Sequence, residues 1–217
     1  MIIFDFDGTI ADTISLGIKL INDYSERFHY NKIDREKMGG LSAFELMKEM
    51  GIKLYRLPYL AWFLRKLLKE RASEIKMNPG IDGLLENLKN AGYKMGIITS
   101  NSSENVKDFL KRNQIETYFS YMKTKVPLLK KKKALSKAKR QLKTGFVYVG
   151  DEIRDVDACR KNNLPVVSVA WGFNSVESLE QVNPGLVAKN ADQANTFIQK
   201  LAENGPDHQG LRRVQLF

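Results

Sequence analysis

The chain begins with Met1-Ile2-Ile3-Phe4-Asp5-Phe6-Asp7-Gly8-Thr9. Four apolar residues come first, and acidic residues and a glycine follow them. A short apolar run that stops at polar residues is typical of a buried strand followed by a loop. The stretch therefore predicts a central strand with Asp5 and Asp7 at its carboxyl end.

Further along the chain, short apolar runs alternate with helical patterns. Strands are predicted at residues 94–98, 146–149, 166–170 and 186–188, and helices at 81–90, around 106–110, and at 131–142, 155–162 and 191–201. Strands that are apolar almost throughout and alternate with helices indicate a parallel sheet covered on both faces. The predicted fold class is α/β.

Between the first strand and residue 78 the periodicity is helical. Apolar residues such as Ile14, Ile18 and Leu64 recur at helical spacing, which predicts three or four helices and no strand. We therefore expect a core domain of residues 1–12 and 78–202 and a small all-helical cap of residues 13–77, inserted after the first strand. Residues 203–217 are rich in polar residues and are expected to form a loosely ordered tail.

The charge of the chain is concentrated in one segment. The 217 residues are 43% hydrophobic and 10% aromatic, enough for a sizeable core, and the formal net charge is +10. Residues 122–143 carry ten basic residues and no acidic one, whereas the rest of the chain has 25 of each. No aromatic residues interleave with these lysines in the manner of a nucleic-acid site, so we do not expect nucleic-acid binding.

The location of the protein can also be predicted. Cys159 is the single cysteine, so no intramolecular disulfide can form and a reducing compartment is expected. The acidic start does not resemble a signal peptide, and no apolar stretch reaches the roughly 18 residues of a membrane span. We expect a cytoplasmic protein without a membrane segment.

Polar residues follow the predicted strands, where an open parallel sheet binds its ligands. They are Asp5, Asp7 and Thr9 after the first strand, Thr99, Ser100 and Asn101 after the second, and Asp151, Glu152 and Asp155 after the third. Carboxylate oxygens are ligands that Mg²⁺ prefers. One aspartate can attack phosphorus, and a second can protonate the leaving alkoxide and later deprotonate the attacking water. A lysine and a hydroxyl can hold the phosphoryl oxygens, so the set favours phosphoryl transfer.

Three of these stretches resemble the motifs of the haloacid dehalogenase superfamily, in particular its phosphoglycolate-phosphatase-like members. They are residues 5–13, 97–101 and 149–155, and the resemblance covers about residues 1–201. It implies a Rossmann-like parallel sheet with a helical cap. It also implies a hydrolase, a Mg²⁺-dependent phosphatase that cleaves a small phosphorylated metabolite through an aspartyl-phosphate.

The resemblance assigns roles to the carboxylates. Asp5 would be the nucleophile and a Mg²⁺ ligand. Asp7 would be the general acid and base and would also bind the metal through its backbone carbonyl. Asp151 would be the remaining metal ligand. Asp155 and Thr9 would not bind the metal themselves but would orient the residues that do.

The phosphoryl group would be bound by Thr99 and Ser100 and by one lysine. The family has one lysine before the third of these strands, where this chain has four in a row. Lys131 is our choice, because the apolar pair after the run then matches the family pattern, and Lys133 is the next candidate. Lys130 and Lys132 are the remaining alternatives.

Two other functions stay open at this point. A phosphomutase uses the same residues and differs only in the acceptor of the phosphoryl group. A non-catalytic protein could use the lysine surface of residues 122–143 for an anionic partner. Either a monomer or a homodimer is compatible with the sequence.

Overall fold

A computed structural model of the chain describes residues 1–34 and 43–203. Its centre is a six-stranded sheet in the order β3-β2-β1-β4-β5-β6, and every strand pair in it is parallel. The strands are β1 (Ile2–Phe4), β2 (Met95–Ile98), β3 (Phe119–Lys123), β4 (Val147–Gly150), β5 (Val166–Val169) and β6 (Val187–Ala188). The predicted α/β class with a parallel sheet is confirmed.

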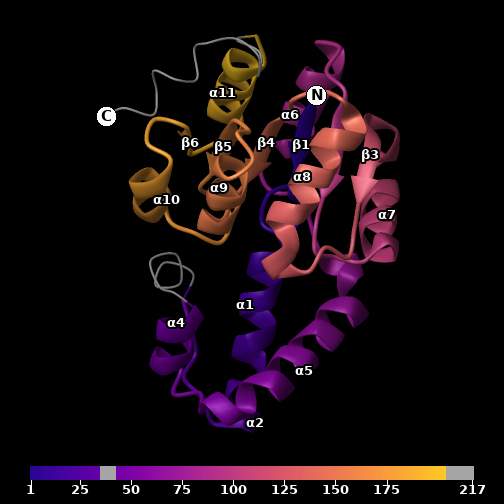
Figure 1. Cartoon of the computed structure of the whole chain (residues 1–217). Helices are drawn as coiled ribbons and strands as arrows, with labels where there is room; N and C mark the ends of the chain where they lie inside the picture. The colour runs from indigo at the N-terminus through magenta and orange to yellow at the C-terminus, as the bar shows by residue number, and fades with distance from the viewer. Residues whose placement is uncertain (35–42, 204–217) are drawn as a thin grey trace.

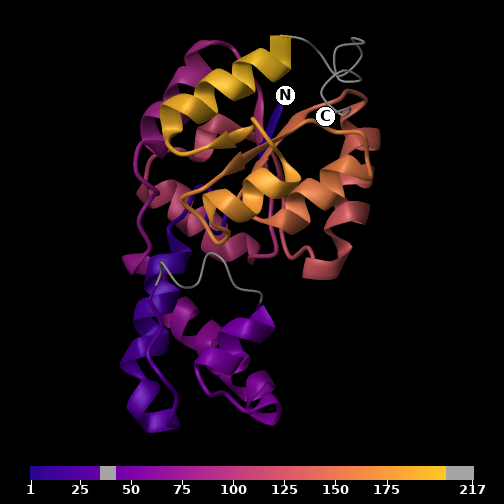
Figure 2. The same ribbon diagram turned by 90° about the vertical axis from the view of Figure 1, so that its left-hand side faces the viewer.

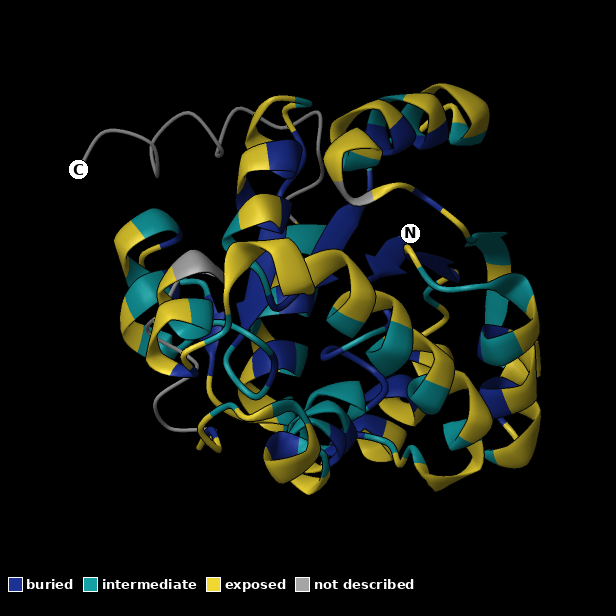
Figure 3. Ribbon diagram, turned by 90° about the horizontal axis from the view of Figure 1, so that it is seen from below, coloured by how far each residue is buried: buried dark blue, intermediate teal, exposed yellow. Residues whose placement is uncertain are grey.

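Helices cover both faces of the sheet, because the strands bury side chains on both sides. Phe4 and Val149 pack into one apolar cluster, whereas Ile3 and Tyr148 pack into the other. The first face carries α6 (Ile81–Asn90), α7 (Ser103–Arg112) and α11 (Ala191–Glu203), and the second carries α8 (Lys131–Leu142) and α9 (Ile153–Arg160). Figure 3 shows the buried strands at the centre and helices with exposed outer sides.

Residues between β1 and α6 form a group of helices at one end of the sheet. They are α1 (Thr13–Asp23), α2 (Ser25–Phe28), α4 (Ala43–Glu49), η1 (Leu54–Arg56), α5 (Leu57–Glu70) and η2 (Ala72–Glu74). These helices lie beyond the carboxyl ends of the strands (Figures 1 and 2). Helix α1 begins where it does because the Asp12 carboxylate accepts a hydrogen bond from Ser15 N–H at 3.0 Å.

The chain enters and leaves this helical segment at adjacent points. Asp12 N–H donates to the Lys76 carbonyl at 2.8 Å, and Asn78 N–H donates to the Ile10 carbonyl at 2.9 Å. The two stretches of chain that connect the helical segment to the sheet therefore run side by side. The boundaries of the cap and core, 13–77 and 1–12 with 78–202, stay a prediction, and residues 35–42 of that cap lie outside the described residues.

Two elements were not expected from the sequence. Strand β3 at the edge of the sheet has only partly buried or exposed side chains, so it lacks the apolar run that marks the other strands. Helix α10 (Val176–Val182) is short, and Leu179 is its buried residue. Two turns, η3 (Glu116–Tyr118) and η4 (Leu128–Lys130), complete the described elements.

The predicted tail falls almost wholly outside the described residues, which end at residue 203. Among the helices of the described ranges, none has the length and apolar character needed to cross a membrane.

Candidate active site

Asp5 stands at the carboxyl end of β1 and is fixed there by the backbone. Its N–H donates to the Val149 carbonyl on β4 at 2.8 Å, and its Oδ1 accepts from Phe6 N–H at 2.8 Å. Its other oxygen, Oδ2, forms an ion pair with Lys131 Nζ. The first carboxylate of the chain and a lysine from the middle of the chain thus meet at the carboxyl ends of the central strands.

Lys131 is the first residue of α8 and reaches into the site. Its ammonium pairs with Asp5 and also with Asp155, whereas Lys132 and Lys133 are exposed. Burial by itself lowers the pKa of the Lys131 ammonium, but the negative charges of Asp5 and Asp155 outweigh burial and raise this pKa well above its usual value. The lysine therefore stays positively charged in the site.

Three carboxylates gather beside this lysine. One oxygen from each of Asp5, Asp151 and Asp155 lies within 4.8 Å of the others. Burial, together with the charge of Asp5, raises the pKa of Asp151 well above its usual range. Burial likewise raises the pKa of Asp155 to about 7, although Lys131 acts in the opposite direction. A cluster of this kind favours the binding of a cation.

Asp151 follows β4 and is held on both of its oxygens. Thr9 Oγ1 donates to Oδ1 at 2.9 Å, and Phe173 N–H donates to Oδ2 at 2.8 Å. Two glycines make room for this carboxylate: a Cβ at Gly8 would lie 2.3 Å from Asp151 Oδ2, and one at Gly172 would lie 2.2 Å from Asp151 Cβ. Gly8 also has a φ of +75°, a conformation that favours glycine.

Asp7 is not a member of the carboxylate cluster and contacts residues that follow β2 instead. Asn101 Nδ2 donates to its Oδ1 at 3.0 Å, and Thr99 Oγ1 donates to its Oδ2 at 3.4 Å. Burial and the nearby charge of Asp5 raise the pKa of Asp7 to about 6. A carboxyl group with this pKa can give and take a proton near neutral pH.

These groups surround a small cavity of about 40 Å³. Asp5, Asp7 and Lys131 line it, and Ser100 after β2 lines it as well. Arg154 also lines it and was not among the predicted site residues, although it stands inside the motif of residues 149–155.

All the predicted site residues lie in this one region, while the alternative lysines do not enter it. Asn101 was quoted after the second strand but was given no role, and its contact with Asp7 was missed. An asparagine in a loop carries no periodic signal, so only its position two residues after Thr99 could have indicated this role.

A divalent cation fits the carboxylates. Asp5 and Asp151 are among the predicted metal ligands and are both in the cluster, and carboxylate oxygens are the ligands that Mg²⁺ prefers. Asp155 is 1% exposed, and its Oδ2 has no hydrogen-bond partner among the described residues. Within the described part of the chain, this buried carboxylate oxygen therefore lacks a positively charged partner, which a bound cation would supply.

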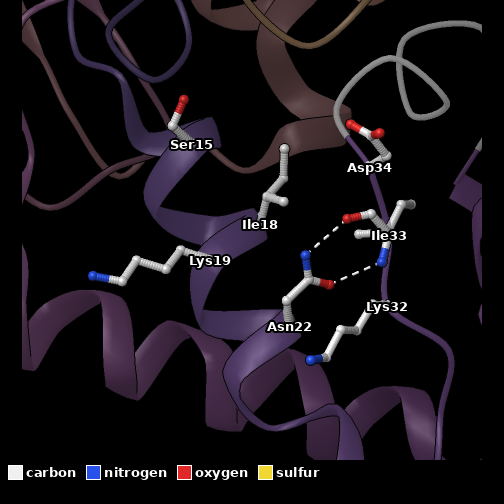
Figure 4. Close-up of a pocket in the computed structure, with 7 residues that line it drawn as sticks. All are labelled: Ser15, Ile18, Lys19, Asn22, Lys32, Ile33 and Asp34. Atoms are coloured by element: carbon white, nitrogen blue, oxygen red, sulfur yellow. Dashed lines mark hydrogen bonds between the residues drawn. The ribbon is translucent and has the colours of Figure 1, made fainter.

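A larger hollow of about 500 Å³ lies elsewhere, between α1 and residues 32–34. Figure 4 shows Asn22 joining its two walls: Asn22 Nδ2 donates to the Ile33 carbonyl, and Asn22 Oδ1 accepts from Ile33 N–H, both at 2.8 Å. None of the predicted site residues lines this hollow. The chemistry of the chain is concentrated at the sheet edge instead.

Known proteins resemble the chain over most of its length. The haloacid dehalogenase-like hydrolase family matches residues 2–169. A phosphoglycolate phosphatase of Synechococcus elongatus is 32% identical over 84% of this chain and 89% of its own. A tyrosine-protein kinase of Mycobacterium tuberculosis is 25% identical over 86% of this chain and 67% of its own.

The fold is shared with solved structures. A haloacid dehalogenase-like hydrolase from Streptococcus pneumoniae superimposes with a TM-score of 0.74 at 22% identity, over 90% of this chain and 96% of the other. The family match spans most of the sheet and the site-bearing loops. The chain belongs to the haloacid dehalogenase-like hydrolases, as a phosphoglycolate-phosphatase-like hydrolase of phosphate esters.

Proposed function

We propose that the protein hydrolyses a small phosphate monoester with the help of Mg²⁺, through an aspartyl-phosphate formed on Asp5. The observation that carries this proposal is the ion pair of Asp5 with Lys131 beside the carboxylates of Asp151 and Asp155. The pair keeps a positive charge next to the attacking oxygen, where the phosphoryl oxygens of the substrate must lie.

In the first step, a carboxylate oxygen of Asp5 attacks phosphorus, and the bond between phosphorus and the ester oxygen breaks. Asp7 gives its proton to the leaving oxygen, which its pKa of about 6 allows. Thr99 and Asn101 hold the Asp7 carboxyl in place for this transfer.

In the second step, water attacks the phosphorus of the aspartyl-phosphate. Asp7, now ionised, takes a proton from that water, and inorganic phosphate leaves while Asp5 regains its carboxylate. Lys131 stabilises the negative charge of the phosphoryl group in both steps. Mg²⁺ bound by Asp5, Asp151 and the Asp7 carbonyl would add positive charge at the phosphoryl oxygens.

The mechanism is tested by replacing the nucleophile. Asp5→Asn keeps the shape of the side chain but lacks the attacking carboxylate, so the release of inorganic phosphate from an aryl phosphate should fall to background. Asp157→Asn, an exposed position on α9, is the matched control and should keep full activity. Activity retained in Asp5→Asn, with an unchanged melting temperature, rules out the mechanism. With a sugar phosphate as the substrate, which has further hydroxyl groups to accept the phosphoryl group, formation of an isomeric phosphate ester in place of inorganic phosphate would favour a phosphomutase.

A further inference from the structure

Asp7 stands between two cavities. One is the small polar cavity that also contains Asp5 and Lys131. The other has a volume of about 270 Å³ and begins at Asp7 and Asn101. If Asp7 protonates the leaving oxygen, as the proposed function requires, then the rest of the leaving group extends into this second cavity.

The wall of the second cavity is apolar. Its side chains come from α1, α4 and α5, and they include Ile14, Ile18, Ile21, Leu46, Leu64 and Leu68. Phe173 lines the cavity from the sheet side, while its own N–H holds Asp151. Among the described residues that line it there is no lysine, arginine or histidine.

The few polar groups in the wall are already in use. Asn101 donates to Asp7, and its Oδ1 accepts from Ser102 N–H at 2.7 Å and from Asn105 Nδ2 at 3.1 Å. The Thr13 side chain also hydrogen-bonds with Asp7. An anionic leaving group would therefore meet no cationic side chain among the described residues of this wall, and burial of an unpaired charge is strongly unfavourable.

For an apolar leaving group, transfer from water into this cavity is favourable. Each methylene removed from water favours binding by a factor of about four. An apolar protein cavity of about 150 Å³ accepts benzene, so 270 Å³ has room for about six to ten carbons. We infer that the substrate is a phosphate monoester whose leaving group is an uncharged, apolar alcohol of this size.

The inference is tested first on the unaltered protein with Mg²⁺. Ethyl, butyl and hexyl phosphate have alcohols of similar acidity, so chain length changes binding far more than reactivity. We expect kcat/KM to rise about fourfold per methylene, and phosphoglycolate, whose leaving group carries a carboxylate, to be at least about a hundredfold poorer than hexyl phosphate. A flat alkyl series, or phosphoglycolate as the best substrate, overturns the inference and leaves the proposed function standing. No phosphate released from any ester overturns the proposed function, and the inference falls with it.

A pair of variants then tests the cavity itself. Leu64→Arg places a cation in the wall, and the ratio of kcat/KM for hexyl phosphate to that for phosphoglycolate should fall about a hundredfold. Leu54→Arg makes the same change at a residue that is 63% exposed, and it should leave the ratio unchanged. Equal ratios in the two variants contradict the inference. If melting curves show that Leu64→Arg is unfolded, Leu64→Ala replaces it, and the preference for hexyl phosphate should fall about tenfold because apolar contact is lost.

Discussion

Asp7 shows how single contacts set the chemistry of one carboxyl group. Burial and the charge of Asp5 raise its pKa to about 6, while the hydrogen bonds from Asn101 and Thr99 act against this rise. A general acid must carry its proton, so the protonated fraction and kcat/KM should fall as the pH rises above about 6.

Asn101→Ala removes a donor that stabilises the ionised form of Asp7. The pKa of Asp7 should therefore rise, and the alkaline limb of the pH profile of kcat/KM should move upward by about one pH unit. Asn113→Ala is the control, because the Asn113 amide donates to the Phe109 carbonyl on α7, away from Asp7. A limb that moves to lower pH, or moves equally in both variants, is incompatible with this account.

The close approach of Gly172 to Asp151 predicts a cost for any side chain at that position. Gly172→Ala places a Cβ 2.2 Å from Asp151 Cβ, so the free energy of unfolding should fall by about 1–3 kcal/mol. Gly83→Ala, in α6 with nothing within 4 Å of its Cβ, should raise it by about 0.5–1 kcal/mol. Urea denaturation measures both. A neutral Gly172→Ala would show that the loop can move away at no cost.

Helix α8 explains how one lysine of four enters the site. Successive side chains on a helix point about 100° apart, so the start of α8 directs Lys131 toward Asp5 and leaves Lys132 and Lys133 exposed. The basic segment of residues 122–143 thus has different parts: one ammonium is buried among carboxylates, and most of the others face solvent.

Lys131→Met keeps the length and apolar stem of the side chain and removes its charge. We expect kcat/KM to fall by about 10²–10³, as happens when one donor to a developing charge is lost. The same change at Lys133, which is exposed, should alter kcat/KM by less than about twofold. A loss of activity of equal size in the two variants would falsify the choice of Lys131.

At the scale of the whole molecule, the parallel sheet gathers carboxylates from distant parts of the chain. Asp5 follows β1, whereas Asp151 and Asp155 follow β4, which is its neighbour in the sheet. Like charges buried this close together destabilise the folded state, and Lys131 offsets only part of their charge. The proposed Mg²⁺ would offset more of it and is therefore also expected to contribute to stability.

Mg²⁺ at a concentration of about 100 times its Kd should stabilise the folded state by roughly 2.7 kcal/mol. For a chain of this size, this corresponds to a rise in Tm of about 5–10 °C. Asp151→Asn should abolish that rise, and Asp192→Asn, in the first turn of α11, should keep it. Thermal melting with Mg²⁺ and with a monovalent salt of equal ionic strength gives the comparison. An equal rise with the monovalent salt argues against a specific site.

The sequence by itself determined the fold class, the family and most of the elements. Their signals are local: apolar runs at β1, β2 and β4 and helical spacing at α6 and α8 are visible in a few residues each. It also ordered the polar residues along the sheet edge, because parallel strands end on one side.

Tertiary structure alone decided what depends on residues far apart in the chain. Strand β3 is half exposed, so its place in the sheet follows from pairing with β2 and not from an apolar run. The bond from Asn101 to Asp7 and the cavity between Ile14 and Phe173 had no sequence signal. The physical reason is that an apolar residue facing a cavity has the same spacing along its helix as one packed in a core, and only the arrangement of its neighbours separates the two.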